Sequence, residues 1–158
     1  MFEILRRVFA EPASEKPAWA FDDPRLAIAV LMLSLASVDG RQTAAETGAI
    51  HAELAHRFGL DSVQIDALTD AARTCGRSST ELQTFAAGLA RRQPIEERRD
   101  VVESLFRIAF SDGALHEFED DLLWRIADLL GVPGHERVAI RKRLEAEAED
   151  DAPPPARA

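Results

Sequence analysis

The stretch Ala36-Ser37-Val38-Asp39-Gly40, followed by Glu46, returns later in the chain as Ala109-Phe110-Ser111-Asp112-Gly113, followed by Glu119. Both copies have the pattern A-x-x-D-G-x5-E, and we call residues 36–46 the first joint and residues 109–119 the second joint. A glycine after a helix readily takes the left-handed conformation that closes the helix. Each joint therefore predicts a connection between two helices, and the repetition predicts two similar helical hairpins with an internal pseudo-twofold relationship.

Only helices are expected around these joints. Apolar residues recur with a period near 3.6, and no segment alternates as a half-buried strand does. Asp23 and Pro24 predict the start of a helix to about residue 39, which is apolar on nearly all sides and therefore central. Thr43 and Glu46 form the capping-box pattern of the next helix. The predicted fold class is all-α, a compact bundle of about seven or eight helices with an internal pseudo-twofold repeat.

Three regions are predicted along the 158 residues, a length that suits one domain. Residues 1–22 form an N-terminal amphipathic segment and a linker, and residues 23–148 form the helical domain. Residues 149–158 are an acidic, proline-rich tail whose composition predicts disorder. The second joint is expected to end a helix that begins near residue 94, and the last helix is expected over about 133–148.

Composition and the absence of known motifs exclude several classes of function. The net charge of −9 argues against nucleic-acid binding, which needs a basic face. The single cysteine excludes an internal disulfide, and no nucleotide-binding loop, serine-nucleophile elbow or HExxH motif occurs. We therefore expect no enzymatic activity. The longest apolar run, residues 26–38, is too short to span a bilayer, and no secretory signal is evident. These features predict a cytoplasmic protein, or one that lies at the inner face of the membrane through its amphipathic N-terminus.

The acidic residues of the joints admit two interpretations. In the structural interpretation, each glycine ends a helix and each glutamate caps the next one. That interpretation leaves Asp39 and Asp112 unexplained, because an anion at the C-terminal end of a helix is disfavoured by about 0.3–1 kcal/mol. In the second interpretation the joints hold a divalent cation, since clustered carboxylates are the ligands that Ca²⁺ and Mg²⁺ prefer. The candidate metal ligands are Asp112, Glu119, Glu117, Asp39 and Glu46.

The joints differ from an EF-hand, although the spacing from glycine to glutamate is the same. The positions that would supply the first two carboxylates of the loop are Leu35 and Ser37 in one copy and Ile108 and Phe110 in the other. A metal-dependent hydrolase is a further interpretation of the clustered carboxylates, and it requires a deep pocket that contains both joints.

The paired joints, each between a long buried helix and a helix that ends at Phe-Gly-Leu (58–60) or Leu-Gly-Val (130–132), resemble the TerB-like tellurite-resistance family. The resemblance covers about residues 24–145 and matches Asp39, Gly40 and Glu46, then the corresponding residues of the second joint. It implies an all-helical bundle without catalytic activity, linked to tellurite and chemical-stress response. It also implies protein partners, membrane-associated and cation-handling ones among them, and metal binding through acidic residues.

Two departures from the family pattern affect the expected metal binding by each joint. Family members often have another acidic residue early in the first joint, where this chain has Arg41, Gln42 and Thr43. In the second joint His116 stands where aspartate is common, beside the additional carboxylate of Glu117. The second joint is thus the better candidate for an ion. The alternative function is a protein-interaction module of the kind found beside J-domains in co-chaperones, in which both joints are purely structural.

Overall fold

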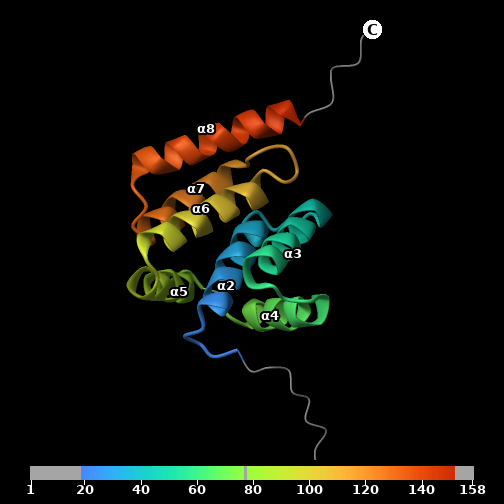
Figure 1. Cartoon of the computed structure of the whole chain (residues 1–158), viewed down its shortest axis with the longest axis vertical. Helices are drawn as coiled ribbons and strands as arrows, with labels where there is room; N and C mark the ends of the chain where they lie inside the picture. The colour runs from blue at the N-terminus through green and yellow to red at the C-terminus, as the bar shows by residue number, and fades with distance from the viewer. Residues whose placement is uncertain (1–18, 77, 152–158) are drawn as a thin grey trace, which may run out of the picture.

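Seven α-helices and no strand make up the part of the computed structural model that is described, residues 19–76 and 78–151 (Figure 1). This confirms the all-α bundle. The helices are α2 (Pro24–Ser37), α3 (Ala44–Phe58), α4 (Ser62–Thr74), α5 (Ser79–Arg92), α6 (Ile95–Ala109), α7 (Glu117–Leu129) and α8 (Gly134–Asp150). The expected N-terminal amphipathic segment, and the tail beyond Asp151, lie outside the described residues.

The first helix of the described chain, α2, occupies the centre of the bundle and contacts α3, α4, α5, α6 and α7 (Figure 1). Asp23 caps its start, accepting a hydrogen bond from the Arg25 amide at 2.9 Å, and Pro24 occupies the first turn. Leu31 and Met32 at its middle have no exposed surface. The continuous apolar sequence of α2 is therefore explained by contacts on all sides.

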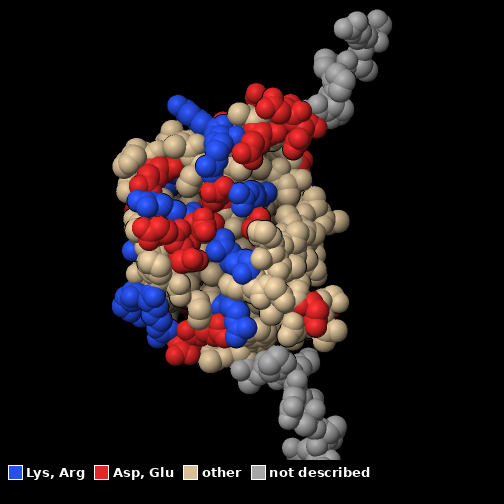
Figure 2. All heavy atoms as spheres, viewed as in Figure 1, with Lys and Arg blue, Asp and Glu red and all other residues tan. Residues whose placement is uncertain are grey.

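The helices before the joints are shorter than expected. α2 ends at Ser37 instead of residue 39, and α6 ends at Ala109 instead of residue 112. Asp39 and Asp112 consequently lie in the turns and not on the helices. At the other end of the chain, α8 continues through Asp150, so residues 149 and 150, which were expected in the disordered tail, are helical. Acidic side chains gather at this end of α8 (Figure 2).

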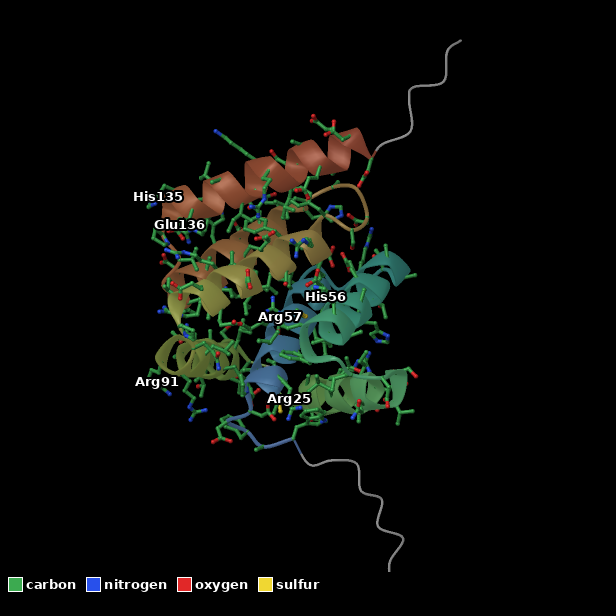
Figure 3. All side chains as sticks on the ribbon, viewed as in Figure 1. Arg25, His56, Arg57, Arg91, His135 and Glu136 are labelled. Atoms are coloured by element: carbon green, nitrogen blue, oxygen red, sulfur yellow. The ribbon has the colours of Figure 1, made fainter. Side chains whose placement is uncertain are left out.

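The two hairpins, α2–α3 and α6–α7, pack against each other through α2·α6, α3·α6 and α2·α7 contacts. Arg57 on α3 connects the hairpins: its Nη2 donates to the Asp100 carbonyl oxygen at 3.1 Å and to Ser104 Oγ at 2.7 Å, both on α6 (Figure 3). Ser104 is fully buried and donates to Glu53 Oε2 at 2.8 Å. This polar clamp fixes α3 against α6.

No helix among the described residues is long and apolar enough to cross a membrane.

Candidate cation site between the two joints

The turns of the two joints have the same local geometry. Gly40 has φ +76° and Gly113 has φ +95°, in the left-handed region that glycine adopts at little cost. Asp39 Oδ1 accepts a hydrogen bond from the Arg41 amide at 2.9 Å, and Asp112 Oδ1 accepts one from the Ala114 amide at 3.2 Å. Such an aspartate bonded to the amide two residues later is a common turn motif. Both aspartates therefore have a structural partner, and the helix-dipole penalty does not apply to them.

In the first joint, Glu46 is almost completely buried, with 1% of its surface exposed. The predicted capping box is complete: the Glu46 amide donates to Thr43 Oγ1 at 3.1 Å, and the Thr43 amide donates to Glu46 Oε2 at 3.1 Å. The other carboxylate oxygen, Oε1, is buried without a hydrogen-bond partner. Capping thus accounts for only one of the two oxygens of Glu46.

In the second joint, Glu119 holds the equivalent position on α7 and is equally buried, with 1% exposed. Here no capping box forms, because His116 is the N-cap residue and its side chain makes no cap hydrogen bond. Oε2 of Glu119 is buried without a partner. Burial, followed by the negative charge of Glu46, raises the pKa of Glu119 to about 7, while nearby His116 acts in the opposite direction.

The negative charge of Glu46 contributes to the raised pKa of Glu119, so the two joints lie near the same end of the bundle. Asp112 and Asp39 also raise that pKa, so carboxylates from both hairpins surround one buried side chain. The sequence left open whether the joints lie at the same end of the bundle. In Figure 1 the start of α3 and the α6–α7 connection lie together at the upper right. The joints form one acidic cluster, which we call the joint cluster: Asp39, Glu46, Asp112, His116 and Glu119.

His116 belongs to this cluster through Asp112. Its Nε2 lies 3.1 Å from Asp112 Oδ2. The hydrogen bond with Asp112 and its negative charge raise the pKa of His116, and Glu119 and Asp39 add to the effect. The imidazole is half exposed, with 50% of its side chain accessible, whereas both glutamates are buried. The cluster therefore has two fixed, buried carboxylates and a more accessible imidazole and aspartate pair.

Two other acidic residues near the second joint have different surroundings. Glu117 is exposed on the first turn of α7 and is not among the charges that shift the pKa of Glu119. Asp120, which follows Glu119 in the sequence, pairs with Arg141 of α8 at 3.1 Å. The other oxygen of Asp120, Oδ1, is buried without a hydrogen-bond partner, and the expectation that Glu117 binds a metal stays a prediction.

The joint cluster suits a divalent cation in its chemistry but is not arranged around one. Within residues 19–76 and 78–151, no group of three or more His, Cys, Asp or Glu side chains is positioned to hold a metal ion. Within the joint cluster, Glu46 Oε1 and Glu119 Oε2 are buried without a hydrogen-bond partner, as is Oδ1 of the neighbouring Asp120, and a cation would supply a partner. Further ligands require rotation of Asp39, Asp112 or His116 from their present hydrogen bonds. Three surface pockets of the described residues, beside α5, between α2 and α7, and between α3 and α6, are not lined by Glu46 or Glu119.

Comparison with known proteins identifies the family of this chain. Residues 25–142 match the family model described as tellurite resistance protein TerB. A crystal structure of a protein of unknown function from Porphyromonas gingivalis W83 is similar, with a TM-score of 0.58 and 26% sequence identity. The similarity covers 79% of this chain and 97% of that one. No curated protein matches the chain. Because the family model spans most of the chain and both joints, the protein belongs to the TerB tellurite-resistance family.

Proposed function

We propose that this protein is a non-enzymatic binding module of the tellurite and chemical-stress response, and that a divalent cation binds at the joint cluster. Family membership supports a role related to tellurite resistance. The observation that carries the cation is the pair of buried carboxylates, Glu46 and Glu119, each with an unpartnered oxygen. A buried carboxylate without a partner is costly, and either a proton or a cation relieves that cost.

The cation supplies the positive charge that the cluster lacks, and the protein's own residues determine where it sits. Glu46 and Glu119 lie in the first turns of α3 and α7, so an ion bound by both would connect the two hairpins. Asp39 and Asp112 lie in the turns before these helices, and each accepts a hydrogen bond from one backbone amide. Binding of the cation would therefore link the two halves of the bundle. It would also displace the proton that Glu119 carries below about pH 7, where its raised pKa keeps it protonated.

Calorimetric titration of the full chain with Ca²⁺, Mg²⁺, Mn²⁺ and Zn²⁺ tests this proposal. One ion per chain is expected, because the cluster is shared between the joints. The variant Glu46→Gln/Glu119→Gln should lose binding, whereas the control Asp121→Asn, an exposed carboxylate of the same helix, should bind as the wild type does. No binding tighter than millimolar, or unchanged binding in the double glutamine variant, would refute the cation site.

A second candidate is a protein-interaction or co-chaperone-like module with purely structural joints. The complete capping box of Thr43 and Glu46 and the hydrogen-bonded aspartate turns favour it, because these contacts stabilise both joints without an ion. Its partners, like those of the leading proposal, would be proteins, including ones at the inner face of the membrane. Pull-down with the full chain and with a chain lacking residues 149–158 separates the bundle from the acidic tail. Equal recovery of one partner with and without a chelator would favour this candidate.

A further inference from the structure

We propose that the pocket between α2, α4, α5 and α7 binds a small organic anion, a molecule with a carboxylate or phosphate group on a short apolar body. In Figure 1, α2 lies between α4 and α5, and α7 contacts both α2 and α5. The pocket has a volume of about 390 Å³, which falls in the range of known small-molecule sites, about 300–1,000 Å³. The described residues that line it include no member of the joint cluster, so this proposal is independent of the cation.

The charge of the pocket is the first argument. The whole chain has a net charge of −9, yet the described residues that line this pocket include two arginines, Arg73 and Arg125, and no aspartate or glutamate. The pocket between α3 and α6, by contrast, is lined by four carboxylates and two arginines. A concave surface with one sign of charge attracts ligands of the opposite sign. The pocket beside α7 therefore favours an anion.

Arg125 is the residue that we expect to bind the anionic group. It is exposed on α7 and forms no hydrogen bond or ion pair with another described residue. Arg73 at the end of α4 differs, because its Nη1 pairs with Asp70 Oδ1 at 3.0 Å. A guanidinium presents a planar set of N–H donors that fits a carboxylate or a phosphate. The described part of the chain thus leaves the donors of Arg125 for a ligand.

Hydroxyl groups and the start of α5 add further donors. Ser34, Ser37, Ser78 and Ser79 all line the pocket. The hydroxyls of Ser37 and Ser78 already have backbone partners, whereas those of Ser34 and Ser79 bond to no described residue. The first amides of a helix such as α5 lack partners within the helix, and the helix dipole is positive at this end. These groups complement the charge of Arg125.

The apolar part of the lining determines the rest of the ligand. Leu33, Ala72, Leu82 and Leu122 line the pocket, and all four belong to the buried core. An inorganic ion would leave this apolar surface in contact with water, whereas a short apolar body would cover it. The pocket should therefore bind an organic anion more tightly than an inorganic one.

Calorimetric titration of the full chain with phenyl phosphate and with benzoate tests the proposal. Both should bind at least about tenfold more tightly than benzyl alcohol, which lacks the charge, and phenyl phosphate should exceed inorganic phosphate by a similar factor. Arg125→Gln should lose about tenfold in affinity for either organic anion, because a hydrogen bond to a charged group is lost. Lys142→Gln removes an exposed cation of α8, away from the pocket, and should bind as the wild type does.

Three results would overturn the proposal. The first is the absence of millimolar binding of both organic anions, and the second is equal binding of benzyl alcohol, which would mean a merely apolar pocket. The third is an unchanged affinity in Arg125→Gln. Each of these leaves the cation site untouched, because that site is tested with metal ions and with the glutamine variants of Glu46 and Glu119.

Cys75 gives a second readout, since it is the single cysteine of the chain, is half-buried and lines the pocket. Iodoacetate and iodoacetamide alkylate the same sulfur with loss of iodide, and they differ in charge. The ratio of their rates should be several-fold higher in the folded chain than in the urea-unfolded chain, and Arg125→Gln should lower it. Phenyl phosphate should protect Cys75 from both reagents. A ratio equal to that of the unfolded chain, or no protection, would contradict an anion pocket at this position.

Discussion

Glu46 and Glu119 come from equivalent positions in the two halves of the chain, both are buried, and the charge of Glu46 raises the pKa of Glu119. Both side chains are 1% exposed. Buried carboxylates that form no ion pair are unusual in a stable bundle. The predictions below address their titration, the caps and turns that hold them, and the clamp between the hairpins.

The first prediction concerns pH. The pKa of Glu119 is about 7 in the folded protein, compared with 4.5 for an ordinary glutamate. Between these values the folded state holds a proton that the unfolded state has lost, so the free energy of unfolding should fall as pH rises from about 4.5 to about 7. The raised pKa corresponds to about 3 kcal/mol across this range. Urea unfolding at several pH values should show the fall in wild type and a much smaller one in Glu119→Gln. Parallel pH profiles for the two proteins would contradict the burial of an uncompensated carboxylate.

The second prediction concerns the first-joint cap. Thr43→Ala removes the acceptor of the Glu46 amide and should lower the free energy of unfolding by about 1 kcal/mol. Thr43→Ser keeps a hydroxyl at this position and should stay close to wild type. Thermal unfolding followed by circular dichroism measures both. Equal losses in the two variants would mean that the methyl group of Thr43, and not its hydroxyl, provides the stabilisation.

The third prediction compares two glycines. A Cβ at Gly40 or at Gly48 would meet no atom within 4 Å, so only the backbone distinguishes them. Gly40 has φ +76°, and Gly40→Ala should destabilise by about 1 kcal/mol. Gly48 lies inside α3, and Gly48→Ala should stabilise by roughly 0.5–1 kcal/mol. Denaturant midpoints of the two variants should therefore move in opposite directions. A shift of the same sign in both would contradict the left-handed turn.

The fourth prediction concerns the clamp between the hairpins. Arg57→Met removes the donor to Ser104 and to the Asp100 carbonyl, and the loss should be about 1–3 kcal/mol. Arg91→Ala on the exposed end of α5 is the control and should change stability by less than about 0.5 kcal/mol (Figure 3). A double-mutant cycle with Ser104→Ala should show coupling between the two side chains. Strictly additive losses would mean that the Arg57–Ser104 hydrogen bond contributes nothing to stability.

The sequence by itself determined the helices, their starts and the two joints. Pro24, Gly40 and the capping box of Thr43 act over a few residues, so their effect is readable from local spacing. The ends of two helices were predicted less accurately than their starts. Both α2 and α6 stop before Asp39 and Asp112, because each aspartate accepts a hydrogen bond from a backbone amide of the turn. The sequence also identified Glu46, Glu119 and His116 as residues to follow.

Only the tertiary structure decided which of these residues meet. Packing of α2 against α6 brought the joints to one end of the bundle, and burial together with the charge of Glu46 then raised the pKa of Glu119. The same packing directed Asp120 to Arg141 and left Glu117 exposed. Local spacing carries no information on these outcomes, because they depend on contacts between helices far apart in the chain and on how much water each carboxylate loses.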